Sequence, residues 1–256
     1  MIDTHVHLDD PNFDRDRDYV INSLLENGIT RVYNIGSDIV SSRASVDLAS
    51  MYEEVYAVVG IHPHDASTYN EYIEKELIDL SKHEKVRAIG EIGLDFYYDN
   101  SPRDIQEEVF RKQIELAHTL NLPVVIHSRE ASQLTFDIVK EYKKKYPEMK
   151  FLIHCFSQSV EMMEEYVKLG VNISIGGVVT FKNARTVKDV AKAVPIEDLL
   201  LETDCPYLSP VPHRGKRNEP KNVKYVAEEI AKIRNINVKE LIKICDENAL
   251  RFYGDL

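Results

Sequence analysis

The chain has 256 residues, of which 43% are hydrophobic and 29% are charged, and its formal net charge is −11. This composition is that of a globular protein with a sizeable core, and no run of about 18 apolar residues exists that would span a membrane. The negative charge opposes passive coating of a nucleic acid, but it permits an enzyme that holds a few nucleotides through local cations.

The cysteines and the first residues of the chain indicate the cellular compartment in which the protein is expected. Cys155, Cys205 and Cys245 are an odd number without a framework spacing, so we expect a reducing compartment and no structural disulfide. No basic and apolar leader precedes Asp3. We therefore predict a cytoplasmic protein without a membrane partner. The sequence indicates no obligate protein partner and no particular oligomeric state.

Short apolar runs rich in β-branched residues alternate with helical patterns along the chain. The predicted strands are, in order, residues 2–7, 31–35, 55–60, 86–90, 123–127, 151–154, 171–175 and 199–202. Helical spacing of apolar residues follows most of them. The predicted helices include residues 15–27, 71–82, 131–145 and 160–169.

Local signals place several helix ends. Gly28 ends the first predicted helix. The clearest helix start has Ser101 as N-cap and Pro102 at the first helical position. The last helix is predicted to begin at Asn237, with Glu240 as its capping partner.

The alternation of strand and helix, eight times over, predicts an α/β fold with a parallel sheet covered on its faces. Eight such units are the number that closes a TIM-type (β/α)8 barrel. A doubly wound open sheet is the alternative, but it normally has fewer strands, and no Gly-rich turn follows the first strand here. No linker, repeat or low-complexity segment interrupts the pattern. We predict one barrel domain over residues 1–256.

Polar side chains fall where the predicted strands end. These residues are His5 and His7 on the first strand, His62 after the third, Glu91 after the fourth, His127 on the fifth, His154 on the sixth and Asp204 after the eighth. In a parallel barrel, the carboxyl ends of all strands meet at one rim. A single histidine at such a place is more often a packing residue, but packing does not readily explain five histidines and two acids. The pattern predicts a metal site at this rim.

The ligand types limit which metal ions can bind, and the number of ligands indicates how many ions bind. Imidazoles with carboxylates suit Zn²⁺, Mn²⁺, Fe²⁺, Ni²⁺ or Mg²⁺. Six candidate ligands exceed what one tetrahedral ion with an open position needs, and they suit two ions about 3.5–4 Å apart. We predict two divalent ions per chain, with Zn, Mg or Mn as the candidates. The expected ligands are His5, His7 and Asp204 for one ion and His127 and His154 for the other, with Glu91 shared.

This chemistry predicts hydrolysis. Two such ions lower the pKa of a bound water to about 7 and stabilise the attacking and leaving oxygens. Asp204 would act as the general base that accepts the proton of the water. The predicted catalytic residues are Asp204 and Glu91. Phosphoesters fit well, because charge develops on oxygens that cations stabilise.

Four further residues are candidates for binding the substrate. His62 would lie near the metals or bind a phosphate, with a structural role as the alternative. Arg129 lies two residues after His127, so it shares its face and would reach a phosphate, with a surface ion pair as the alternative. Arg214 and Lys216 belong to the cationic loop 212–217 after the last strand. This loop is a candidate clamp for backbone phosphates, and a solvated turn is the alternative.

The chain resembles the TatD-type metal-dependent deoxyribonucleases, which belong to the amidohydrolase-like barrels. The matching stretches run in family order over nearly the whole chain: residues 3–8, 60–64, 90–95, 127–131, 154–157, 202–208 and 214–220. The resemblance implies a barrel, divalent cations and hydrolysis of DNA, with exonuclease action expected. It also implies metal ligands at His5, His7, Glu91, His127, His154 and Asp204.

Two other functions remain open from the sequence. The same chemistry would serve a hydrolase of another ester or amide, such as an aminoacyl-tRNA ester or a lactone. A barrel that binds metal or nucleic acid without turnover is the second alternative, against which the complete ligand set argues.

Overall fold

The structure, a computed structural model, describes residues 1–254, so the last two residues of the predicted 1–256 domain lie outside it. Eight strands form one sheet in sequence order. They are β1 (Ile2–Val6), β2 (Arg31–Ile35), β3 (Val55–Val59), β4 (Val86–Asp95), β5 (Val124–Arg129), β6 (Phe151–Ile153), β7 (Asn172–Ile175) and β8 (Leu199–Leu201). Parallel register holds for β1–β2, β3–β4, β4–β5, β5–β6 and β7–β8.

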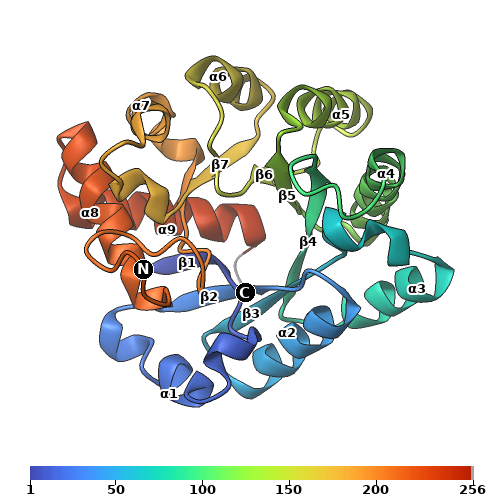
Figure 1. The fold of residues 1–256 in the computed structure, drawn as a ribbon, viewed down its shortest axis with the longest axis horizontal. Helices are drawn as coiled ribbons and strands as arrows, with labels where there is room; N and C mark the ends of the chain where they lie inside the picture. Colours follow the sequence, from blue (N-terminus) through green and yellow to red (C-terminus); the bar gives the residue numbers. More distant parts are fainter. Residues whose placement is uncertain (255–256) are drawn as a thin grey trace. The chain divides into compact units, whose positions relative to one another are not determined.

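Helices follow the strands along the chain (Figure 1). The α-helices are α1 (Arg17–Asn22), α2 (Ile39–Met51), α3 (Glu71–Leu80), α4 (Arg103–Leu120), α5 (Ser132–Lys145), α6 (Val160–Lys168), α7 (Arg185–Ala193), α8 (Val223–Arg234) and α9 (Val238–Tyr253). Val6 of β1 also forms a parallel bridge with Cys205, which lies after β8. This is the arrangement of a TIM-type (β/α)8 barrel, so the predicted fold class is confirmed.

The sequence located every strand, but β4 and β5 extend further than predicted. Strand β4 continues past Glu91 to Asp95, and β5 continues past His127 to Arg129. The two strands pair over this extension, with Gly93 opposite His127 and Asp95 opposite Arg129. The expectation that Glu91 and His127 stand at strand ends was therefore wrong, because the extra residues gain ladder hydrogen bonds from each other.

Helix ends were predicted with mixed success. Gly28, at φ 75°, follows a short 3-10 turn and ends the first helical segment as expected. Asn237 caps α9 by accepting a hydrogen bond from the Lys239 backbone N–H. The N-cap at Ser101 was wrong, because Pro102 holds that position in α4. The Ser101 hydroxyl instead donates to the His64 carbonyl oxygen at 2.8 Å and accepts from the Ser67 N–H at 3.1 Å.

The chain divides into two compact units that interleave in sequence. The first unit comprises Met1–Asn34, Tyr52–Val55 and the chain from Cys155 onward. In it, α8 contacts both α7 and α9, and α9 contacts β1 and β8 (Figure 1). Tyr253 of α9 stacks on Tyr33 of β2 with ring centroids 3.7 Å apart, and its hydroxyl donates to the Thr4 carbonyl oxygen. The last helix thereby fixes the strand that carries His5.

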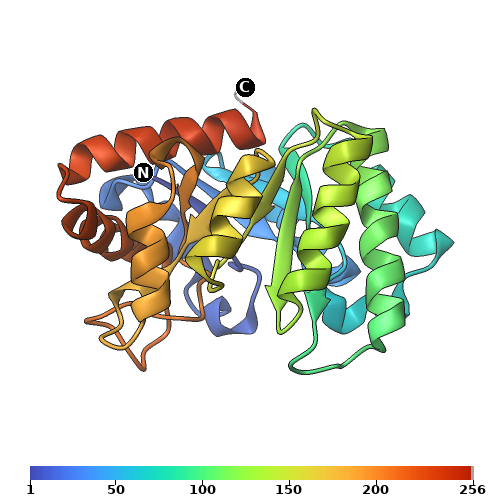
Figure 2. The same cartoon turned by 90° about the horizontal axis from the view of Figure 1, so that it is seen from above.

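The second unit comprises Ile35–Met51 and Tyr56–His154. Here α4 packs on β4, and α4 and α5 lie side by side in both views (Figures 1 and 2). Arg111 and Glu115 of α4 form ion pairs with Glu141 and Lys145 of α5. Between residues 1 and 254, no helix is both long and apolar enough to cross a bilayer.

Candidate metal-binding sites

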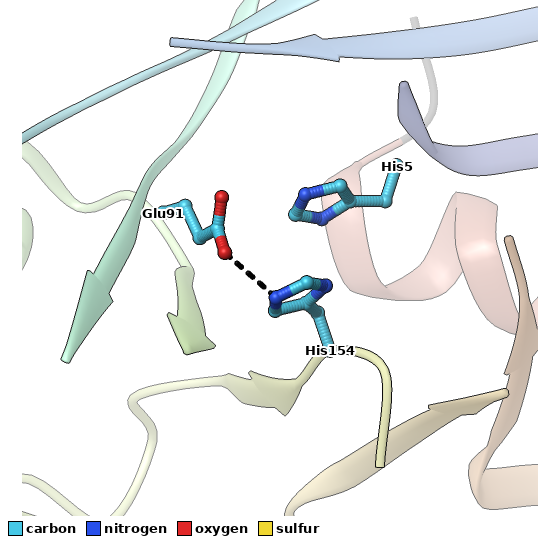
Figure 3. A group of neighbouring side chains, drawn as sticks. All are labelled: His5, Glu91 and His154. Carbon is cyan, nitrogen blue, oxygen red and sulfur yellow. Dashed lines mark ion pairs between the residues drawn. The ribbon is translucent and has the colours of Figure 1, made fainter. Parts of the chain in front are cut away.

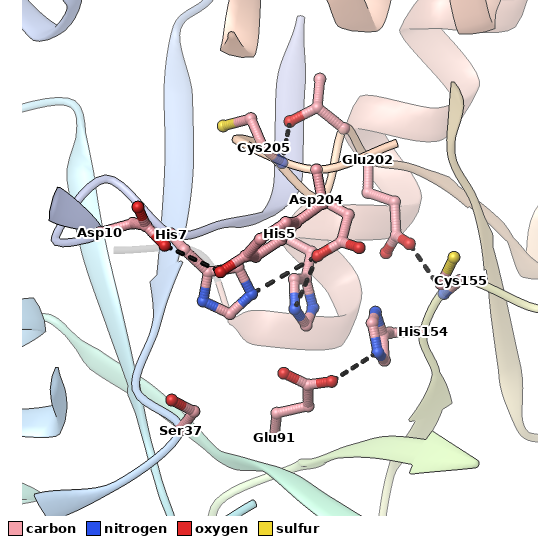
Figure 4. A network of polar contacts seen from close by, with 12 residues as sticks. His5, His7, Asp10, Ser37, Glu91, His154, Cys155, Glu202, Asp204 and Cys205 are labelled. Atoms are coloured by element: carbon pink, nitrogen blue, oxygen red, sulfur yellow. Dashed lines mark hydrogen bonds and ion pairs between the residues drawn. The ribbon is translucent and has the colours of Figure 1, made fainter. Parts of the chain in front are cut away.

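The first cluster of potential ligands belongs to the first unit and joins the two ends of the chain. His5 lies in β1, His7 follows that strand, and Asp204 follows β8. Asp204 Oδ1 is 3.4 Å from His7 Nε2 and 3.8 Å from His5 Nε2 (Figure 4). One ligand atom from each residue lies within 4.8 Å of the others, which is the spacing that one cation requires.

Backbone contacts hold this cluster in place. The Asp204 N–H donates to the His5 carbonyl oxygen at 2.9 Å, and the His7 N–H donates to the Cys205 carbonyl oxygen at 2.8 Å. Asp204 has φ 58°, a left-handed conformation that aspartate tolerates better than most residues. Such conformations persist where the surrounding structure enforces them, and they cluster at functional sites.

Two buried acids, Asp3 and Glu202, support the same cluster. Asp3 accepts hydrogen bonds from the Thr203 N–H at 2.9 Å and from the Thr203 hydroxyl at 2.6 Å. Burial raises the pKa of Asp3 well above its ordinary value, although the Thr203 hydrogen bonds oppose that rise. Glu202 accepts from the Ser174 hydroxyl and from the Cys155 N–H, the latter at 2.7 Å (Figure 4). Both acids orient segments that carry or adjoin the cluster.

The second cluster belongs to the second unit and is centred on the carboxylate of Glu91. Its Oε1 atom lies 2.7 Å from His154 Nε2, 2.8 Å from His127 Nδ1 and 3.6 Å from His62 Nε2. Figure 3 shows the Glu91 carboxylate facing the His154 ring. His62, Glu91 and His127 each offer an atom within 4.8 Å of the others.

Ionisation in this cluster follows from burial and from the imidazoles. Burial by itself raises the pKa of Glu91, but His154, His62 and the hydrogen bond with His127 outweigh it and hold that pKa well below its usual value. Burial lowers the pKa of His62 well below its ordinary value, which favours a neutral ring. Burial also lowers the pKa of His127, but hydrogen bonds with Asp95 and Glu91 produce a net rise.

Asp95 and His64 are members of the second cluster that the sequence reasoning missed. Asp95 Oδ2 lies 3.0 Å from His127 Nε2 and 3.1 Å from His64 Nε2, and the Asp95 side chain is 1% exposed. It thereby orients the far side of the His127 ring, as carboxylates do for metal-bound histidines. The available signal was the spacing Glu91-x-Gly93-x-Asp95, which places both acids on one face of a strand.

Both clusters fit a divalent cation. Two imidazole nitrogens lie within 2.8 Å of a single oxygen of Glu91, so imidazole and carboxylate groups that can bind a divalent cation converge there. The first cluster pairs two imidazoles with one carboxylate oxygen. Both donor sets suit Zn²⁺, Mn²⁺ or Mg²⁺ sites that keep open positions. When bound, such cations supply an activated water and stabilise charge on phosphate oxygens.

The predicted substrate-binding residues take three different positions. His62 is 8% exposed and belongs to the Glu91 cluster. Arg129 is exposed at the end of β5, with its guanidinium 4.0 Å from the centre of the Tyr97 ring. Arg214 and Lys216 are exposed on the loop after β8, and Arg214 lies 3.7 Å over the Phe181 ring.

Arg217, from the same cationic loop, has a different role. Its guanidinium forms a bidentate ion pair with Asp16 at 2.6 and 2.8 Å and also contacts Glu219 at 3.2 Å. These contacts fix the base of the loop to the segment before α1, so the loop presents Arg214 and Lys216 as its available cations.

Comparisons with known proteins extend over the whole chain. The sequence matches the family described as TatD related DNase over residues 2–254. YabD of Bacillus subtilis, named an uncharacterized metal-dependent hydrolase, is 43% identical over 253 residues, covering 99% of this chain and 98% of YabD. YcfH of Escherichia coli, also named an uncharacterized metal-dependent hydrolase, is 34% identical over 256 residues, covering 99% of this chain and 95% of YcfH.

A solved structure agrees with the fold. YJJV, a TatD homolog from Escherichia coli, superposes with a TM-score of 0.93 at 28% identity, covering 100% of this chain and 98% of that one. The superposition covers the chain from end to end and supports the (β/α)8 assignment.

Proposed function

Because the chain belongs to the TatD-related DNase family and is a metal-dependent hydrolase, we propose that its substrate is DNA and that it cleaves phosphodiester bonds. The proposal uses two divalent cations per chain, one at each cluster, with Zn, Mg or Mn as candidates. Glu91 as a ligand common to both ions is a prediction from the sequence and is part of this proposal.

Each named residue has a defined task in this function. The Asp204 carboxylate accepts the proton of the attacking water, because it adjoins the imidazoles of His5 and His7 and has a partly exposed side chain. His127 and His154 hold the Glu91 carboxylate in position. Arg214 and Lys216 bind backbone phosphates of the substrate.

The observation that carries a nucleic-acid substrate is the cationic loop in the same unit as Asp204. The chain has a net charge of −11, yet Arg214 and Lys216 are both exposed on one loop that follows the Asp204 segment. Contacts from such side chains to phosphates position a strand without reading its sequence. An acidic protein requires a local positive surface of this kind to bind a polyanion.

The test couples metal analysis to DNA digestion. The metals in the purified protein are measured, and labelled single- and double-stranded DNA is then digested with Mg²⁺, Mn²⁺ or Zn²⁺. We expect cleavage that Asp204→Ala abolishes and that Asp189→Ala, a change at an exposed aspartate of α7 in the same unit, leaves intact. Metal-loaded protein that degrades no DNA, or an Asp204→Ala variant as active as the unaltered protein, would contradict the proposal.

Two further comparisons refine the result. We propose exonuclease action, so linear single-stranded DNA should be degraded and circular single-stranded DNA of the same sequence should persist. A panel of aminoacyl esters, amides and lactones tests for a hydrolase of another bond. The cytoplasmic location belongs to the same proposal and is checked by cell fractionation.

A further inference from the structure

Two exposed tyrosines and an arginine lie beside the second cluster, and the function proposed above gives them no role. Tyr97 is 57% exposed and Tyr98 is 55% exposed, directly after the end of β4. Their rings meet edge to face, with centroids 4.8 Å apart and an interplanar angle of 88°. The Arg129 guanidinium lies 4.0 Å from the centre of the Tyr97 ring and 4.9 Å from that of Tyr98. We call these three residues the tyrosine platform.

The backbone under the tyrosine platform is held firmly. Asp95 Oδ1 accepts hydrogen bonds from the N–H groups of Tyr97 and Tyr98, both at 3.0 Å. The Phe96 N–H donates to the Arg129 carbonyl oxygen at 2.9 Å. Arg103 covers the Phe96 ring at 4.5 Å and forms an ion pair with Asp99. The backbone that carries the two exposed rings is therefore fixed, so stacking of a ligand on them does not require ordering of this segment.

The tyrosine platform is connected directly to the Glu91 cluster. Asp95 contacts the platform backbone through Oδ1, and its Oδ2 contacts His127 and His64. The His64 ring meets the Tyr98 ring edge to face, with centroids 5.4 Å apart. A ligand on the tyrosines would thus lie next to the residues that surround Glu91.

The chemistry of the platform indicates its ligand. Arg129 forms no ion pair with any residue from 1 to 254, so its charge is available to an anion. Tyrosine rings stack on nucleobases of every kind, because each base has a π face. A guanidinium beside them offers paired donors to a phosphate. Folding gains little from leaving two adjacent aromatic rings more than half exposed.

We propose that the tyrosine platform is a nucleotide-binding subsite that holds one unpaired base of the substrate by stacking, with Arg129 on the adjacent phosphate. The inference rests on the proposed function and specifies how the strand is held near the Glu91 cluster. A base inside a duplex already stacks on its neighbours, so the subsite accepts an unpaired nucleotide. Because stacking contacts the face of a base and not its edge, the subsite binds all four bases.

The test compares two probes on metal-loaded protein. One is a phosphorothioate-linked thymidine decamer, which resists cleavage, and the other is its abasic counterpart with the same backbone. The protein has 14 tyrosines and no tryptophan, so quenching of tyrosine emission reports stacking. We expect the decamer to bind about five- to hundredfold more tightly than the abasic strand, the range that stacking of one base gives.

Three variants assign this preference to the platform. The double change Tyr97→Leu with Tyr98→Leu should abolish the preference for the decamer. The double change to Phe should retain it, because the ring is kept. Tyr72→Leu, which alters a tyrosine that is 70% exposed on α3, is the matched control and should bind as the unaltered protein does.

The failures of the inference and of the proposed function are distinguishable. Equal binding of the two probes, or a preference that survives in the double Leu variant while DNA is still cleaved, would overturn the subsite and leave the nuclease proposal standing. Protein that binds neither probe and cleaves no DNA would overturn both.

Discussion

Replacing Glu91 by glutamine tests whether the second cluster holds a cation. A cation that binds only the folded protein stabilises it by about 2.7 kcal/mol when its free concentration is 100 times its dissociation constant. Glu91→Gln keeps the size of a side chain that is 7% exposed and removes its charge. Altering groups that merely orient metal ligands weakens affinity by about 10- to 100-fold, so we expect a loss of at least about 100-fold here.

That loss has a defined thermal consequence. A 100-fold weaker site at the same cation concentration stabilises by only about 0.4 kcal/mol, a loss of about 2.3 kcal/mol. For a chain of this size, 1 kcal/mol corresponds to about 2–4 °C in Tm. The increase in Tm that Mn²⁺ or Zn²⁺ produces over chelator should therefore be about 5–9 °C smaller in Glu91→Gln than in the unaltered protein.

The assay is thermal unfolding followed by far-UV circular dichroism, with chelator and with saturating cation. Glu108→Gln, at an exposed glutamate of α4 that forms an ion pair with Lys112, is the control and should keep the full increase. Calorimetric titration with the metal alone gives the dissociation constants that set the concentrations. An increase in Glu91→Gln equal to that of the unaltered protein would show that Glu91 is not a ligand.

Three further predictions concern other parts of the chain. A double-mutant cycle on Arg217 and Asp16 should give a coupling free energy of about 1 kcal/mol, because the ion pair is bidentate but partly exposed. The coupling should fall in high salt. Urea unfolding of the single and double variants measures the coupling, and a value near zero would refute the prediction. Burial raises the pKa of Cys245 to about 12, so at pH 8 its thiol is almost wholly protonated, and it should react with a disulfide reagent only after unfolding; in a variant lacking the other two cysteines, rapid labelling of folded protein would contradict this. The raised pKa also means that the folded state holds this proton more tightly, so the contribution of Cys245 to stability is present below the thiol pKa of the unfolded chain and is lost as the pH rises through about 12. Changing Arg214 or Lys216 to Ala should raise KM for DNA and leave kcat unchanged. Each change should also lower the slope of log binding constant against log salt concentration by about one counterion. Fluorescence anisotropy across a salt series measures this slope, and an unchanged slope would exclude a phosphate contact.

Predictions from the sequence succeeded where the signal was local. Strand β2 was predicted at its exact bounds, because Arg31–Ile35 is a short apolar run between turn residues. Gly28 and Asn237 were placed correctly as helix ends, since a cap depends on a few neighbouring residues. The ligand assignments, which rest on residue type and on position along the strands, stay a prediction.

Predictions failed where a side chain had a choice of partners. Ser101 has the sequence context of an N-cap, but its hydroxyl bonds His64 and Ser67 instead. Arg217 looked like its neighbour Arg214, yet it lies against Asp16, about 200 positions earlier. Asp95 was missed because the predicted strand ended before it, whereas β4 continues to Asp95.

The sequence by itself determined the order of strands and helices and the kinds of atoms available to bind a cation, because periodicity and residue type are properties of short segments. Only the tertiary structure decided which of those atoms approach one another: Thr203 donates to Asp3 across 200 positions, and Asp95 joins His127 to the exposed tyrosines. Such contacts depend on how β-strands distant in the chain are brought together, and hydrogen bonds and ion pairs act only over a few ångströms. Sequence spacing carries no measure of that distance.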